Sequence, residues 1–164
     1  MKNKNTLYLA QAGMVAAIYV ALTVVFAPFS FGEVQVRLAE ALTILPAFTP
    51  AAVPGLFVGC LLGNMLGGAV LPDIVFGSLA TLIGAVGTRM LRKANPYLAP
   101  VPPILANALI VPFVLKYAYA VDLPIPLMML TVGLGEVLSC GVLGMILYFA
   151  LKKRKGQIFE DTNK

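Results

Sequence analysis

The chain has 164 residues, of which 60% are hydrophobic and 12% charged, and its mean hydropathy is +0.91. Because soluble domains are about half apolar and about a quarter charged, this composition indicates an integral membrane protein and leaves almost no room for a soluble domain. The formal net charge of +5 does not indicate a nucleic-acid-binding protein, since the basic residues lie mainly at the chain ends and beside the ends of apolar runs.

Six apolar runs follow one another along the chain. A membrane-spanning helix needs roughly 20 apolar residues, so a chain of this length with short turns holds about six of them. The sequence therefore predicts an all-α membrane protein, a compact bundle of six transmembrane helices that forms one domain over residues 1–164. Prolines mark the turns, because proline lacks a backbone donor and ends or kinks a helix. The predicted spans are 7–27, 35–49, 51–70, 73–92, 103–120 and 125–151.

The distribution of basic residues predicts the topology. The first run follows two lysines as a signal sequence would, but it is longer than a signal h-region, so we expect an uncleaved first span. Basic residues also close the fourth span and follow the sixth. The positive-inside rule then places both termini in the cytoplasm, which requires an even number of spans. The basic residues concerned are Lys2 and Lys4, Arg89, Arg92 and Lys93, and the run 152–155.

Small residues recur every fourth position in two of the spans. In the third span this spacing indicates tight packing against a neighbouring helix, because it lets two backbones approach closely. In the first span the same spacing has two open interpretations, internal packing or docking on the helices of a partner protein. The stripe of the third span is Gly55, Gly59, Gly63 and Gly67; the first span carries Gly13, Ala17 and Ala21, with Ala12 and Ala16 in a parallel row.

Ionisable side chains inside the predicted spans are few. A charge within a bilayer costs about 3 kcal/mol and normally faces a cavity, a partner or a substrate. If the second helix begins just before Val34, then Glu33, Arg37 and Glu40 occupy positions i, i+4 and i+7 and share one helix face. Glu136 lies near the middle of the last span. The other polar candidates are Asn64, Asp73 and Asn107.

These polar groups either pair within the bundle and anchor its ends, or they line a binding pocket. Glu40 and Glu136 are the strongest pocket candidates, because a carboxylate deep in the membrane without a cation on its own helix is typical of a functional site. The predicted topology places most of the polar groups in the outer half of the bundle. The sequence thus favours a small helical bundle with an outward-facing polar pocket.

Missing residue types and motifs exclude several classes of function. There is no histidine, and Cys60 and Cys140 stand singly in apolar runs, so we expect no metal-ligand cluster, disulfide framework or cofactor. The chain has no P-loop for ATP and cannot form the usual hydrolase triad. An intramembrane enzyme that uses Glu40 and Glu136 as acid and base stays open, as does a small self-associating pore.

Long stretches of the sequence resemble a known family. The segment VQVRLAEALTILPAFTPAAVPGLFVGCLLGN, followed by PDIVFGSLATLIGAVGTR, PPILANALIVPFVL and GEVLSC, resembles the QueT family, the substrate-binding S components of energy-coupling-factor (ECF) transporters assigned to queuosine precursors. The resemblance implies six helices, a pocket near the outer face of the bacterial cytoplasmic membrane, and reliance on a module of one transmembrane coupling subunit and two ATPases. The chain itself would be no enzyme, and the small-residue face of its first helix would dock on this module.

The resemblance implies a 7-deazaguanine substrate such as preQ1, preQ0 or queuine. Its guanine-like edge offers adjacent N–H donors, which a carboxylate accepts side by side, so Glu136 or Glu40 is a suitable reader. A second carboxylate, Asp73 or the other glutamate, would balance the charge of an aminomethyl group. An amide such as Asn64 or Asn107 would bind the remaining edge. We expect the outer loop PFSFGEVQ to close over the base. The predicted substrate-binding residues are Gln35, Arg37, Glu40, Asn64, Asp73, Asn107 and Glu136.

Two points stay open at this stage. Arg37 would either hold a carboxylate in position or face the purine oxygen. The chain would alternatively be an S component for another small vitamin or nucleobase, since carboxylates and amides also suit thiamine or pyrimidines.

Overall fold

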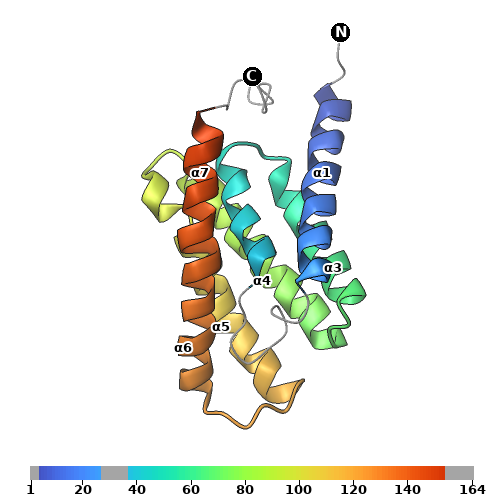
Figure 1. The fold of residues 1–164 in the computed structure, drawn as a ribbon, viewed down its shortest axis with the longest axis vertical. Helices are drawn as coiled ribbons and strands as arrows, with labels where there is room; N and C mark the ends of the chain where they lie inside the picture. The colour runs from blue at the N-terminus through green and yellow to red at the C-terminus, as the bar shows by residue number, and fades with distance from the viewer. Residues whose placement is uncertain (1–3, 27–36, 154–164) are drawn as a thin grey trace.

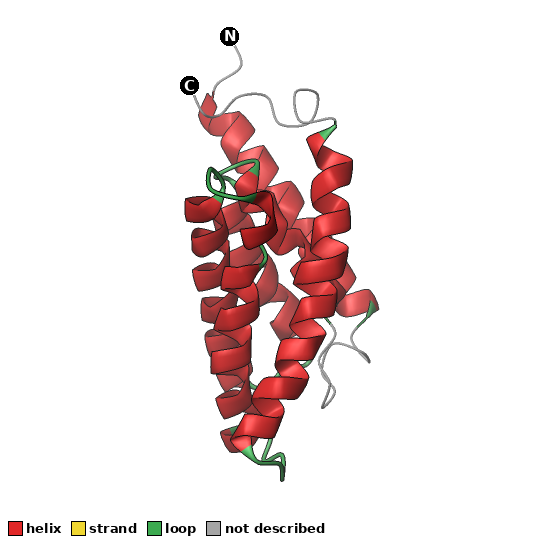
Figure 2. Cartoon of the chain, turned by 90° about the vertical axis from the view of Figure 1, so that its left-hand side faces the viewer, coloured by secondary structure: helices red, strands yellow, loops and turns green. Residues whose placement is uncertain are grey.

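The computed structural model describes residues 4–26 and 37–153, and this part of the chain contains helices and turns but no strand (Figure 2). The predicted all-α fold is therefore confirmed over the described ranges. The helices are α1 Lys4–Val25, the 3-10 helix η1 Leu38–Ala47, α3 Ala52–Leu66, α4 Leu71–Leu91, the short 3-10 helix η2 Pro96–Leu98, α5 Val101–Tyr117, α6 Ile125–Glu136, the π-helix η3 Val137–Leu143 and α7 Gly144–Lys152.

The helices run up and down the long axis of an elongated bundle (Figure 1). α6, η3 and α7 follow one another without a break and form a single rod along one side. The first turn of α1 and the last turn of α7 lie at the same end of the bundle (Figure 1). This arrangement suits an even number of crossings, whereas the side of the membrane that each end faces stays a prediction.

Four helical segments are long and apolar enough to cross a membrane, namely Lys4–Val25, Leu71–Leu91, Pro96–Tyr117 and Ile125–Lys152. The predicted spans 35–49 and 51–70 correspond instead to the shorter helices η1 and α3, of 10 and 15 residues. At about 2.0 Å per residue η1 extends only about 20 Å, less than the roughly 30 Å of a bilayer core. The described part of the chain therefore does not confirm a full membrane-crossing helix over 35–49, and the count of six spans stays a prediction.

The second predicted helix also begins later than expected. Arg37 has extended backbone angles (φ −90°, ψ 100°), and the helix starts at Leu38. The expected stacking of Glu33, Arg37 and Glu40 on one helix face is thus wrong for Arg37, because an extended residue does not continue a helical face. Glu33 lies outside the described residues. Pro46, inside η1, has no backbone donor and limits how far a regular helix can continue.

Helix η1 occupies the interior of the bundle. Most of its residues are buried, including Glu40, Thr43 and Ile44. It packs against α1 on one side and against α4 and the η3–α7 rod on the others. A short apolar helix enclosed in this way places its two polar side chains, Glu40 and Thr43, in the interior, where neighbouring elements must supply their partners.

The predicted glycine stripe of α3 packs against α1, as the sequence indicates. A Cβ atom added at Gly55 would lie 2.6 Å from the backbone oxygen of Ala12, and one added at Gly59 would lie 3.0 Å from the Cα of Ala16. At Gly63 the nearest neighbour would be the Cβ of Thr23, at 3.1 Å. The absence of side chains at these positions therefore lets the two backbones approach to a distance that any larger residue would prevent.

We expect Gly59→Ala to destabilise the bundle, because the new methyl group would lie 2.8 Å from the Cβ of Tyr19 and neither helix can yield without moving its neighbour. Overpacking of this kind lowers the free energy of unfolding by about 1–3 kcal/mol. Thermal unfolding of the detergent-solubilised protein measures the effect. Gly13→Ala is the matched control, since a Cβ there has no neighbour within 4 Å; equal melting temperatures for both variants would contradict the prediction.

Candidate ligand-binding site

The predicted binding residues gather inside the bundle. Each of them is at most 5% exposed, except Gln35, which lies outside the described residues. They come from the start of η1, from α3, α4 and α5, and from the last residue of α6. The structure brings them together in two neighbouring groups, Arg37 with Asn64 and Asp73, and Glu40 with Asn107 and Glu136.

The first group, which we call the arginine group, is a closed network around Asp73. Arg37 Nη2 lies 3.2 Å from Oδ2 of Asp73 and forms a buried ion pair with it, while Arg37 Nη1 lies 3.5 Å from Oδ1 of Asn64. Asn64 in turn donates from Nδ2 to the backbone oxygen of Asp73 at 3.3 Å. Tyr119 donates to Oδ2 of Asp73 at 3.0 Å. Arg37 therefore holds a carboxylate in position, which is one of the two roles that the sequence left open.

The arginine group also joins elements that are distant in sequence. Asp73 lies in the first turn of α4, where the positive end of the helix dipole stabilises a negative side chain. Tyr119 follows α5, and its hydroxyl also accepts from the backbone N–H of Val70 at 3.3 Å. Tyr119 was not among the predicted site residues. The sequence feature that could have identified it is its position at the outer end of the predicted fifth span, at the same membrane depth as the start of the fourth.

The second group, which we call the carboxylate group, is centred on Glu40 and Glu136. Oε1 of Glu40 accepts hydrogen bonds from the hydroxyl of Tyr19 and from that of Thr81, the latter at 3.1 Å. Its side chain is fully buried. These two hydrogen bonds offset the free-energy cost of burying the carboxyl group away from water. Tyr19 and Thr81 were not predicted, because neither differs in sequence from an ordinary core residue.

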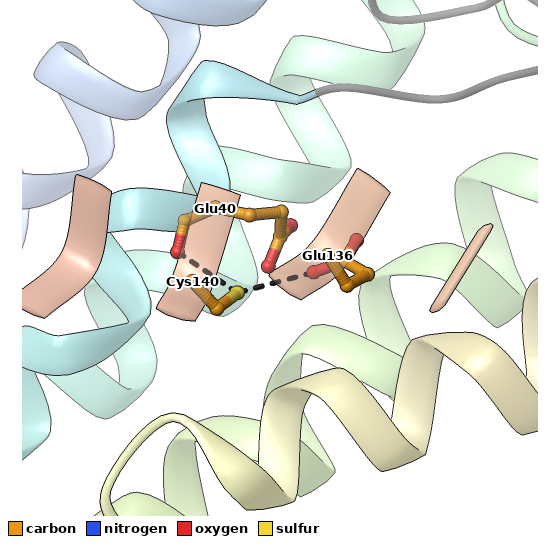
Figure 3. Close-up of side chains that lie close together, drawn as sticks. All are labelled: Glu40, Glu136 and Cys140. Atoms are coloured by element: carbon orange, nitrogen blue, oxygen red, sulfur yellow. Dashed lines mark hydrogen bonds between the residues drawn. The ribbon is translucent and has the colours of Figure 1, made fainter. Parts of the chain in front are cut away.

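Glu136, the last residue of α6, lies close to Glu40, and Figure 3 shows the two side chains with Cys140 beside them. One carboxylate oxygen of each glutamate and the sulfur of Cys140 all lie within 4.8 Å of one another. The Cys140 thiol lies 3.1 Å from Oε2 of Glu136 and 3.4 Å from the backbone oxygen of Glu40. Asn107, from α5, stands beside both carboxyl groups.

Three buried polar atoms of this region have no hydrogen-bond partner among the described residues. They are Oε2 of Glu40, Nδ2 of Asn107 and Oγ of Ser139. Leaving a buried polar group unpaired costs about 1–3 kcal/mol, and more if it is charged. An unpaired acceptor and an unpaired donor beside two carboxyl groups therefore point to a ligand that offers both kinds of group.

A π-helical turn shapes this site. It begins directly after Glu136 and contains Ser139 and Cys140. Such turns are rare inside α-helices and occur frequently at functional sites, because they change the direction in which side chains leave the helix. The turn was not predicted from the sequence, although the glycines around Glu136 mark a helix with low intrinsic stability.

The trio Glu40, Glu136 and Cys140 also has the donor atoms of a metal site. Carboxylates with a thiolate suit zinc and related divalent ions. The sequence predicted no metal-ligand cluster, because it has no histidine and its two cysteines stand singly. Glu136 and Cys140 are four positions apart, but Glu40 is 100 positions from Cys140. The fold creates the cluster by bringing η1 next to the last turn of α6 and the π-helical turn.

The predicted docking residues of α1 fall on two faces. Gly13, Ala17 and Ala21 are exposed. Ala12 and Ala16 are partly buried and pack against the glycine stripe of α3. The internal-packing interpretation thus applies to the second row, while the first row remains available for a partner.

Comparison with known proteins agrees with the resemblance seen in the sequence. A family model described as QueT transporter matches residues 9–153. The queuosine precursor transporter QueT of Lactococcus lactis subsp. cremoris (strain MG1363) is 31% identical over 85 residues, which cover 51% of this chain and 50% of that protein. The chain thus matches about half the length of this relative. No solved structure matches the chain.

We expect Arg37→Met to destabilise the protein strongly, because it leaves the Asp73 carboxylate buried without its cation. Removing one partner of a buried ion pair costs about 3–5 kcal/mol. The double variant Arg37→Met/Asp73→Asn should recover much of this loss, since neither charge of the pair remains. Thermal unfolding in detergent measures both; an Arg37→Met protein as stable as the wild type would contradict the assigned role of the pair.

Proposed function

The chain belongs to the QueT transporter family, and on this premise we propose that it is the substrate-binding S component of an ECF importer that captures a queuosine precursor. The substrate class is a 7-deazaguanine such as preQ1, preQ0 or queuine. The relative from Lactococcus lactis, a queuosine precursor transporter, supports this class. The protein would bind its substrate without changing it, and partner ATPases would drive uptake across the bacterial cytoplasmic membrane.

The carboxylate group is the observation that carries this proposal. A deazaguanine offers adjacent N–H donors on one edge, and a carboxylate can accept two of them side by side. Glu40 has a buried oxygen without a partner among the described residues, and Asn107 beside it has an unpaired donor. Glu136 lies within reach of the same ligand. These groups match a base that presents both donors and acceptors.

The arginine group supports a division of roles. Because Asp73 is already paired with Arg37, we propose that Glu40 or Glu136, and not Asp73, balances the charge of an aminomethyl substituent when one is present. Asn64 and Asp73 would then form the wall next to the base. Gln35 and the loop 28–35, proposed to close over the base, lie outside the described residues.

The exposed small residues of α1 support the proposed assembly with an ECF module, which consists of one coupling subunit and two ATPases. Lipid provides no hydrophobic drive for helix association, so close contact depends on residues that let backbones approach. Gly13, Ala17 and Ala21 offer such a face. The whole bundle, with both termini in the cytoplasm, would reorient when the ATPases move the coupling subunit.

An intramembrane enzyme is the second candidate, because two carboxyl groups within 4.8 Å of each other could also act as acid and base. An S component for another vitamin or nucleobase is the nearest alternative. Purification followed by mass spectrometry of the extracted ligand separates all three. We expect an unmodified 7-deazaguanine; another vitamin or base would identify the alternative S component, and a converted product would identify the enzyme.

We expect Glu136→Gln and Glu40→Gln each to weaken binding of preQ1 by about tenfold to 100-fold. The amide replaces an acceptor with a donor that faces the donors of the base, and a hydrogen bond to a charged group contributes about 1.5–3 kcal/mol. Isothermal titration calorimetry measures the affinity. Asp122→Asn is the control, since this carboxylate is fully exposed; unchanged affinity in a glutamate variant would remove that residue from the site.

We expect Ala17→Leu to reduce uptake by cells at least about tenfold while leaving the affinity for preQ1 unchanged, because a large side chain keeps the partner helix at a distance. Co-purification with the ECF module and uptake of labelled substrate measure the two effects. Ala150→Leu places the same change at an exposed position of α7. Normal assembly and uptake by the Ala17 variant would exclude this face as the docking surface.

A further inference from the structure

Tyr19 is one of the largest fully buried side chains among the described residues, with an exposed fraction of 1%. It belongs to α1, the helix whose opposite face carries Ala17 and Ala21 in exposed positions. Its hydroxyl donates a hydrogen bond to Oε1 of Glu40. A phenol in an apolar interior needs such a partner, and here the partner belongs to the carboxylate group.

The position of this hydroxyl is fixed by packing. A Cβ atom added at Gly59 would lie 2.8 Å from the Cβ of Tyr19, so the side chain leaves α1 directly over the glycine stripe of α3. A tyrosine has two side-chain torsions and a rigid ring, and close packing at its base restricts the first of them. The hydroxyl therefore reaches Glu40 from a backbone held in place by the α1–α3 contact.

The two oxygens of Glu40 differ in their surroundings. Oε1 has two donors in reach, Tyr19 and Thr81, whereas Oε2 has no partner among the described residues. The single hydroxyl proton of Thr81 is shared, since this oxygen lies 3.1 Å from the backbone oxygen of Gly77 as well as 3.1 Å from Glu40. Tyr19 donates to Glu40 from a rigid ring held by the α1–α3 contact, and this fixed direction constrains how the carboxyl group is turned.

We infer that Tyr19 is a positioning residue for ligand binding, which holds Oε1 of Glu40 so that Oε2 is presented to the N–H donors of the bound base. This inference rests on the proposed function, because it requires Glu40 to contact the ligand. It predicts that Glu40 accepts hydrogen bonds from the ligand through one carboxylate oxygen only, Oε2. Tyr19 then contributes to affinity through Glu40 and makes no contact of its own.

A double-mutant cycle tests this role. We expect Tyr19→Phe to weaken binding of preQ1 about tenfold, as loss of a hydrogen bond to a charged group does. In a Glu40→Gln background the same change should alter the affinity less than about twofold, because the group that Tyr19 positions is already impaired. Titration calorimetry, or competition at high ligand concentration for the weak variants, measures all four proteins.

Three further variants make the test specific. Thr81→Val removes the second, shared donor and should weaken binding less than Tyr19→Phe does. Thr88→Val is its matched control, a buried threonine of the same helix whose hydroxyl donates to the backbone oxygen of Ala99 away from the site. Tyr8→Phe is the control for the loss of a phenol hydroxyl on α1. Both controls should bind as the wild type does.

The outcomes separate this inference from the proposed function. If the wild type binds preQ1 and Tyr19→Phe lowers the affinity tenfold in both the wild-type and the Glu40→Gln backgrounds, Tyr19 has a general structural role and the inference is overturned. Full affinity of the Tyr19→Phe variant would also overturn it. In either case the proposed function stands. Absence of preQ1, preQ0 and queuine binding by the wild-type protein would overturn the proposed function and, with it, the inference.

The threonine pair keeps the inference testable should Tyr19→Phe fail to fold. Weaker binding by Thr81→Val than by Thr88→Val would support the inference, because it would show that the donors of Oε1 govern affinity. Equal affinity of the two threonine variants would overturn it.

Discussion

The structure depends on keeping the carboxyl group of Glu40 inside an apolar bundle. A carboxyl group in such surroundings is costly unless donors surround it. Helices α1 and α4 each direct a hydroxyl at its Oε1, while Thr43 donates to its backbone oxygen at 2.6 Å. Because the two donors to Oε1 come from α1 and α4, the position of η1 and the positions of these two helices are fixed together.

The glycine stripe of α3 makes this arrangement possible. Tyr19 can reach Glu40 only because α1 lies close against α3, and that approach requires the absence of side chains at Gly55 and Gly59. The packing of α1 on α3 and the hydrogen bond from Tyr19 to Glu40 therefore depend on the same helix–helix contact. The same contact orients α1, so that one face meets the interior and the other, with Gly13 and Ala17, stays exposed.

Charge is distributed unevenly between the two polar groups. Arg37 and Asp73 form an ion pair within the arginine group, to which Asn64 and Tyr119 add hydrogen bonds. The carboxylate group contains two acidic side chains, and two of its buried polar atoms have no hydrogen-bond partner in the described part of the chain. In a small-ligand site, some polar groups are hydrogen-bonded within the protein, and a few others form their hydrogen bonds with the ligand.

The sequence by itself determined the helical membrane class, the family, the tight packing of the third helical segment and the burial of polar residues such as Glu136 and Asn107, because composition, glycine spacing and isolated charges are local patterns. Only the tertiary structure decided the rest. It shortened the second helix, paired Arg37 with Asp73, and brought Tyr19 to Glu40. These contacts join residues far apart in the chain, and no periodicity in a single sequence encodes which distant donor a buried carboxyl group will meet.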